Sequence, residues 1–254
     1  MSVTKLVQRI LLVALLWSPA LSEASSRGLD GGSEGIEGAD LAKGFDVVCN
    51  FRTGIYSKRS GDRVSERVKG HQRKLLGSAS IMVDAGHGGS DPGAVANGIE
   101  EKDLNLATAR LVRKFLERKG YTVSMTRDSD VFVPLSERAA MANREGSDLF
   151  VSIHYNSASS AGHGTEVLVY PTVMDGLAGQ CAGDVLDEVV AATGFRNRGV
   201  KPRGDLAVLR ETSMAAILVE GGFISSPSDS VKLKDPETIE DIAAAIAAGV
   251  DDCL

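Results

Sequence analysis

Residues 81–89, with the sequence IMVDAGHGG, form an apolar run that ends in His87 set between glycines. An apolar run stopped by glycines is typical of a buried strand that leads into a tight loop. Glycines also let the backbone and a ligand come close around the imidazole ring. We therefore expect His87 at the exit of a strand.

Two later segments repeat this arrangement of an apolar run followed by a polar residue. Residues 148–153 lead into His154, and residues 215–219 lead into Glu220, which two glycines follow. In open α/β sheets, ligands bind in the crevice beyond the carboxyl ends of the strands. The three polar side chains at these strand exits are thus predicted to converge on one site.

The rest of the pattern predicts an α/β fold with a single twisted, mostly parallel (mixed) sheet of about six strands and helices on both faces. Strands that alternate with helices indicate such a layered sheet. Further strands are expected at residues 121–125, 164–170 and 206–209. Helices are expected at residues 101–119, from 135 or 136 to 145, at 175–193 and at 236–250.

Composition limits the class of partner. The chain of 254 residues is 43% hydrophobic and 24% charged, which is ordinary for a globular protein. Its formal net charge is -6. Binding of nucleic acid needs a basic face, so the overall charge argues against nucleic acid as the main partner.

The N-terminal third divides into two predicted segments before a catalytic domain at residues 78–254. Residues 1–24 have the basic start, apolar centre and small residues of a signal peptide, and the apolar part is too short to favour an uncleaved anchor. We expect export to the periplasm or the extracellular cell wall. Residues 25–77 are rich in glycine and then in basic residues, which predicts a tether that could contact the anionic envelope electrostatically.

Export permits disulfides, yet the three cysteines are an odd number and lie far apart in the sequence. A bridge between Cys49 and Cys253 is conceivable, and unpaired thiols are an equal expectation. No Cys-x-x-Cys spacing occurs, which argues against a thiolate zinc site.

The residues at the strand exits suit a catalytic zinc site, which needs three protein ligands and an open position for water. His87 and His154 are two candidates, and a carboxylate is available at Glu100 or Glu101, where a helix begins. Adjacent helical residues point ~100° apart, so one of the two glutamates is expected to bind. Glu220 is then free to act as the acid/base, and these parts together suit amide hydrolysis.

Several motifs in order resemble the zinc-dependent N-acetylmuramoyl-L-alanine amidases of the Amidase_3 type. They lie at residues 83–89, 91–93, 101–106, 138–143, 152–156, 164–166, 197–201 and 218–225. The resemblance implies that His87, Glu101 and His154 bind Zn²⁺, because the family pattern places the ligand glutamate directly before lysine. It further implies that Glu220 is the catalytic carboxylate and that the substrate is peptidoglycan, cut between N-acetylmuramic acid and L-alanine.

Two alternative functions remain compatible with the sequence. One is an inactive pseudoenzyme that binds muropeptides, although all four candidate site residues are present. The other is a zinc peptidase that cuts within the stem peptide by the same metal chemistry. The sequence does not reveal an activator protein, and we assign no site role to His71 or His163.

Overall fold

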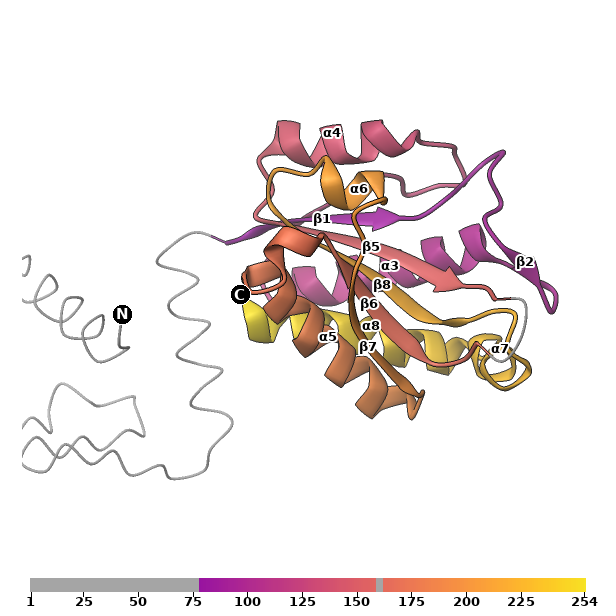
Figure 1. Ribbon diagram of the computed structural model, residues 1–254. Coiled ribbons are helices and arrows are strands. Elements are labelled where there is room, and N and C mark those ends of the chain that lie inside the picture. The colour runs from indigo at the N-terminus through magenta and orange to yellow at the C-terminus, as the bar shows by residue number, and fades with distance from the viewer. Residues whose placement is uncertain (1–77, 159–161) are drawn as a thin grey trace, which may run out of the picture. The chain divides into compact units, whose positions relative to one another are not determined.

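Six strands form one mixed sheet in the order β4-β1-β5-β8-β6-β7 (Figure 1). The computed structural model describes residues 78–158 and 162–254. Neighbouring strands are parallel except β6 and β8, which run antiparallel. The predicted α/β fold is confirmed. The strands are β1 (Ser80–Ala85), β4 (Thr122–Met125), β5 (Leu149–Asn156), β6 (Thr165–Val169), β7 (Asn197–Pro202) and β8 (Ala215–Phe223).

Helices cover the two faces of the sheet unequally. One face packs against α3 (Glu101–Arg118), α5 (Leu177–Thr193) and α8 (Pro236–Cys253), and the other against α4 (Leu135–Glu145) and the short α6 (Ala207–Arg210) (Figure 1). The remaining elements are the hairpin β2 (Val95–Ala96) and β3 (Ile99–Glu100), the 3-10 turn η3 (Pro171–Val173) and α7 (Pro227–Leu233).

Alternation along the strands decides which residues reach each face. Val83 and Val219 belong to the large core under α3, α5 and α8, whereas Phe150, Leu168 and Leu218 belong to the smaller core under α4 and α6. Toward the carboxyl ends of β5 and β8 the next side chains on this face are polar: Ser152 after Phe150, Glu220 after Leu218 and, on the antiparallel strand β6, Glu166 before Leu168. The smaller core therefore stops short of the carboxyl ends of β5 and β8, and that part of the face is left for a site.

The expectation of a strand at residues 206–209 is wrong. The segment forms α6, whose turn is closed by hydrogen bonds from Arg210 N to Leu206 O and from Glu211 N to Ala207 O. Val208 and Leu209 are buried in the smaller core. A run of four apolar residues has no period of its own, so packing decided its conformation.

The expectations of a Cys49–Cys253 bridge or of unpaired thiols are wrong for Cys181 and Cys253. A disulfide bond joins Cys181 on α5 to Cys253 on α8. Both are buried where these two helices pack, and their Cα atoms are 5.1 Å apart. They are separated by 72 residues in the sequence, which is why spacing alone did not pair them. Cys49 lies outside the described residues.

We expect reduction of the Cys181–Cys253 bond to lower the free energy of unfolding. A cross-link that closes a loop of 72 residues restricts the unfolded chain by ~4 kcal/mol in the chain-entropy model. Denaturant unfolding with and without a reductant measures the loss. In the double variant Cys181→Ser/Cys253→Ser the reductant should have no further effect, and an unchanged midpoint for the reduced native protein would contradict the expectation.

The predicted signal peptide (1–24) and tether (25–77) also lie outside the described residues. Within residues 78–158 and 162–254, no helix combines the length and apolarity that crossing a bilayer requires.

Candidate metal centre and acid/base site

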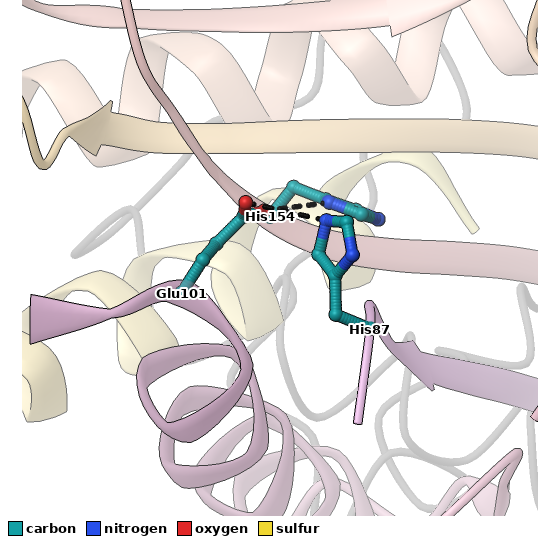
Figure 2. Close-up of side chains that lie close together, drawn as sticks. All are labelled: His87, Glu101 and His154. Atoms are coloured by element: carbon teal, nitrogen blue, oxygen red, sulfur yellow. Dashed lines mark hydrogen bonds and ion pairs between the residues drawn. The ribbon is translucent and has the colours of Figure 1, made fainter. Parts of the chain in front are cut away.

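Three side chains from different elements converge at the carboxyl ends of β1 and β5. Figure 2 shows the rings of His87 and His154 beside the carboxylate of Glu101, which comes from the first residue of α3. One ligand atom from each residue lies within 4.8 Å of the other two. Two imidazole nitrogens and a carboxylate oxygen at this separation fit a divalent metal ion such as zinc.

The loop after β1 presents His87 in a left-handed conformation with φ 58°. Gly88 and Gly89 follow with φ 128° and 58°, so the turn needs residues that tolerate positive φ. The Nδ1 atom of His87 lies 2.8 Å from the Asp91 carboxylate, whose other oxygen accepts from Gly93 N. Asp91 thereby orients the ring and leaves Nε2 toward Glu101, 3.2 Å away.

Glu101 is held by several donors around its carboxylate. Its Oε1 lies 2.8 Å from His154 Nδ1, and its Oε2 accepts from Ala94 N at 3.0 Å. The side chain is buried, whereas Glu100 is exposed and lies 3.7 Å from Lys102 Nζ. The structure thus brings Glu101, not Glu100, to the two histidines.

Close approach of the backbone makes one glycine beside the site essential. A Cβ atom at Gly86 would lie 2.3 Å from the ring of His154. At that separation either the ring or the β1 loop would have to move. The glycine before His87 therefore lets the two histidines share the site.

Electrostatics couples the three groups. Burial lowers the pKa of His87, but the hydrogen bond and charge of Glu101, with a smaller effect of Asp91, raise it to about 9. For Glu101, burial raises the pKa, but hydrogen bonds from His154 and His87 outweigh burial and hold the pKa well below its usual range. Glu101 is thus ionised at neutral pH, and its negative charge favours cations at this place.

Glu220 lies beside this centre on β8. It is the register partner of His154 on the neighbouring strand β5. The side chain is half-buried, yet its Oε2 is enclosed and has no hydrogen-bond partner among the described residues. Burial is the main cause that raises the Glu220 pKa to about 7, and His154 opposes the increase. A carboxyl group in this state can gain and lose a proton near neutral pH.

Two buried arginines support the loop that carries His87. Arg138 on α4 pairs with the buried Asp84 at 2.8 Å and donates to the carbonyl oxygens of Ala85 and His87 at 2.6 Å. Arg127 donates to the oxygens of Ala85 and Gly86, both at 2.8 Å. These contacts satisfy backbone oxygens that the turn leaves without partners in the sheet.

Three of these supporting residues, Asp91, Arg138 and Arg127, were not predicted from the sequence to have a role. Asp91 had a local signal, since an acidic residue four positions after His87 can orient its ring. Arg138 stood inside a motif of the family resemblance, without a role. Arg127 gave no signal, because its partners are backbone atoms far away in the sequence.

The chain is similar in sequence to known proteins. Residues 81–252 match the family model Amidase_3, described as N-acetylmuramoyl-L-alanine amidase. A sporulation-specific N-acetylmuramoyl-L-alanine amidase of Bacillus subtilis (strain 168) is 41% identical over 173 residues, which cover 67% of this chain and 66% of that protein.

Solved structures show the same likeness. N-acetylmuramoyl-L-alanine amidase AmiC2 of Nostoc punctiforme matches with a TM-score of 0.64 and 35% identity, over 68% of this chain and 97% of that chain. The CwlD amidase from Clostridioides difficile, solved in complex with the GerS lipoprotein, matches with a TM-score of 0.66 and 29% identity, over 69% of this chain and 98% of that chain.

Proposed function

Because this chain belongs to the N-acetylmuramoyl-L-alanine amidase family (Amidase_3), we propose that it is a zinc hydrolase that cleaves the amide between N-acetylmuramic acid and L-alanine in peptidoglycan. The observation that carries the proposal is the convergence of His87, Glu101 and His154 next to Glu220. The motifs that produce this convergence are also those in which the chain resembles the family.

His87, Glu101 and His154 are the proposed zinc ligands. Their donor set is the kind that catalytic zinc sites use, with three protein ligands and one position left for water. When bound, zinc supplies Lewis acidity, which polarises the scissile carbonyl and lowers the pKa of water. Asp91 and the backbone N–H of Ala94 keep the His87 ring and the Glu101 carboxylate in position.

Glu220 is the proposed acid/base. The side chain is only half-buried and its Oε2 has no protein donor among the described residues, so the carboxylate is not tied to another protein group and its exposed part can accept a proton from the attacking water. The same carboxyl group then returns the proton to the leaving nitrogen of L-alanine, which departs as a neutral amine. A raised pKa suits both halves of this transfer at neutral pH.

We further propose that the protein is exported and acts on the cell wall in the periplasm or outside the cell, with residues 25–77 as a tether. The signal-like leader supports export. The Cys181–Cys253 disulfide does so too, because disulfides persist in oxidising compartments.

Digestion of purified peptidoglycan tests the function. Mass spectrometry should show intact stem peptides with a free N-terminal alanine, together with glycan that has lost them. A boiled sample provides the background. Peptides cut between amino acids would instead identify a stem peptidase, and muropeptide binding without any release would identify a binding protein.

A further inference from the structure

A row of charged side chains continues across the sheet beyond the acid/base. Glu220 on β8 is the register partner of His154 on one side and of Glu166 on the other. Register partners on neighbouring strands point to the same face, so the three side chains lie side by side on the face that α4 and α6 leave open. The next strand is β7, which forms the edge of the sheet (Figure 1).

An irregularity in β7 brings two cations to this row. The register between β6 and β7 shifts by one residue, so that Arg198 and Gly199 both lie opposite Glu166. In a regular strand, residues 198 and 201 would face opposite sides, because they are three positions apart. The extra residue puts Arg198 and Lys201 on the same side, and Gly199 adopts the required positive φ of 86°.

Both cations meet one carboxylate oxygen. Glu166 Oε2 accepts from Arg198 Nε at 2.6 Å and from Lys201 Nζ at 2.5 Å, while its Oε1 accepts from Asn156 at 3.2 Å. One negative charge thus faces two positive charges, which leaves a net charge of about +1 at the rim of the site. Neutralising the charge of Glu166 would need only one of these cations.

The two cations keep donors for a ligand. The Nη2 group of Arg198 and two of the three protons of Lys201 have no acceptor among the described residues. Arg198 is fixed by stacking over the ring of Phe223, at 4.7 Å from its centroid. The side chain of Lys201 is 39% exposed, so an incoming anion can reach it.

We propose that Arg198 and Lys201, held by Glu166, form a subsite that binds a carboxylate of the stem peptide, namely the free α-carboxylate of the residue after L-alanine. This inference rests on the proposed function. The lactyl carboxyl of the muramic acid is consumed in the scissile amide, so the carboxylates of the substrate lie on the peptide that leaves.

The distances fit a carboxylate near the cleaved bond. Neighbouring strands are ~4.8 Å apart, which puts β7 about 10 Å from the β8 backbone that carries Glu220. Consecutive Cα atoms are ~3.8 Å apart, and the side chains of Lys201 and Arg198 extend back toward β6. The residue directly after L-alanine therefore falls within reach of both cations.

The test compares two soluble muropeptides that differ at one group. One carries D-glutamate with a free α-carboxylate after L-alanine, and the other carries D-isoglutamine, in which that carboxylate is an amide. Lys201→Met should raise KM for the acid about tenfold and leave kcat within about twofold, because it removes one charge-assisted hydrogen bond of ground-state binding. In Lys201→Met the KM for the amide should change little. Lys201→Arg, which keeps the positive charge, should keep the native preference for the acid over the amide.

The variants separate the subsite from a structural role. Lys201 is replaced rather than Arg198 because Glu166 then keeps a cation and does not become a buried unpaired charge. Lys119→Met is the matched control, since Lys119 is a similarly exposed lysine paired with Asp251 away from the site. Equal KM changes for both muropeptides, or no change for the acid, would overturn the subsite. Failure of the native protein to release alanine-started peptides from either muropeptide would overturn the proposed function instead.

Discussion

Replacing Glu220 by Gln is expected to lower turnover by at least ~10²- to 10⁴-fold, the range that general acid–base catalysis contributes. Gln keeps the size of Glu but cannot take a proton from water. Because Glu220 is not among the three proposed metal ligands, the variant should keep its zinc and its fold. Peptide release from soluble muropeptides measures turnover, and metal analysis of the same sample measures zinc.

Two controls separate this chemistry from metal binding. His154→Ala should lose zinc, since two remaining ligands compete poorly with water. Glu100→Gln should retain both zinc and activity, because Glu100 is exposed and Glu101 alone faces the histidines. Near-normal turnover of Glu220→Gln would refute the acid/base role, and zinc loss in Glu100→Gln would refute the ligand assignment.

The pH profile gives a second readout for Glu220. Burial raises the Glu220 pKa to about 7, and a bound dication would lower this value. The group accepts a proton only when ionised, so kcat/KM of the native enzyme should rise with pH and level off at or below about 7. The residual activity of Glu220→Gln should not show this rise of kcat/KM with pH.

Replacing Arg138 by Met is expected to destabilise the protein by about 3–5 kcal/mol, the usual cost of removing one partner from a buried ion pair. Arg138 is buried and pairs with Asp84, which is fully buried. Met replaces the apolar stem of Arg but leaves the Asp84 charge unpaired and the Ala85 and His87 oxygens without this donor. Denaturant unfolding at neutral pH measures the loss.

The exposed pair on the same helix provides the control. Arg144 on α4 pairs with Glu137 at 2.7 Å, and both side chains are largely in solvent. Exposed pairs contribute little to stability, so Arg144→Met should unfold almost like the native protein. If both variants lost the same stability, burial of the Arg138 pair would not be the cause.

The loss caused by Arg138→Met should also depend on pH. Burial raises the pKa of Asp84, but Arg138 and hydrogen bonds from Ser152 and Thr126 lower it below 3.8 in the native protein. The native protein therefore keeps this stabilisation above about pH 4 and loses it as pH falls further. Without Arg138, burial dominates and the Asp84 pKa increases. Protonation of Asp84 then removes the unpaired buried charge and with it part of the destabilisation of the variant. The difference in unfolding free energy should be largest at neutral pH and shrink toward pH 4.

The sequence by itself determined the type of fold and the polar residues that stand at the strand exits. The apolar runs before His87, His154 and Glu220 specified buried strands, because burial on both faces of a parallel sheet requires near-continuous apolar sequence. Parallel strands place their carboxyl ends at one edge, so the convergence of these side chains could be predicted without coordinates. The sequence also limited the proposed carboxylate ligand to Glu100 or Glu101, and the family pattern favoured Glu101.

Only the tertiary structure decided the contacts between residues distant in the sequence. The apolar residues at 206–209 are helical where a strand was expected, because Val208 and Leu209 pack into the smaller core in that conformation. Cys181 and Cys253 form a disulfide because α5 packs on α8. The one-residue register shift that brings Arg198 and Lys201 together arises from the pairing of β6 with β7. Such pairings depend on which surfaces meet when the whole chain packs, so they cannot be predicted from local periodicity or propensity.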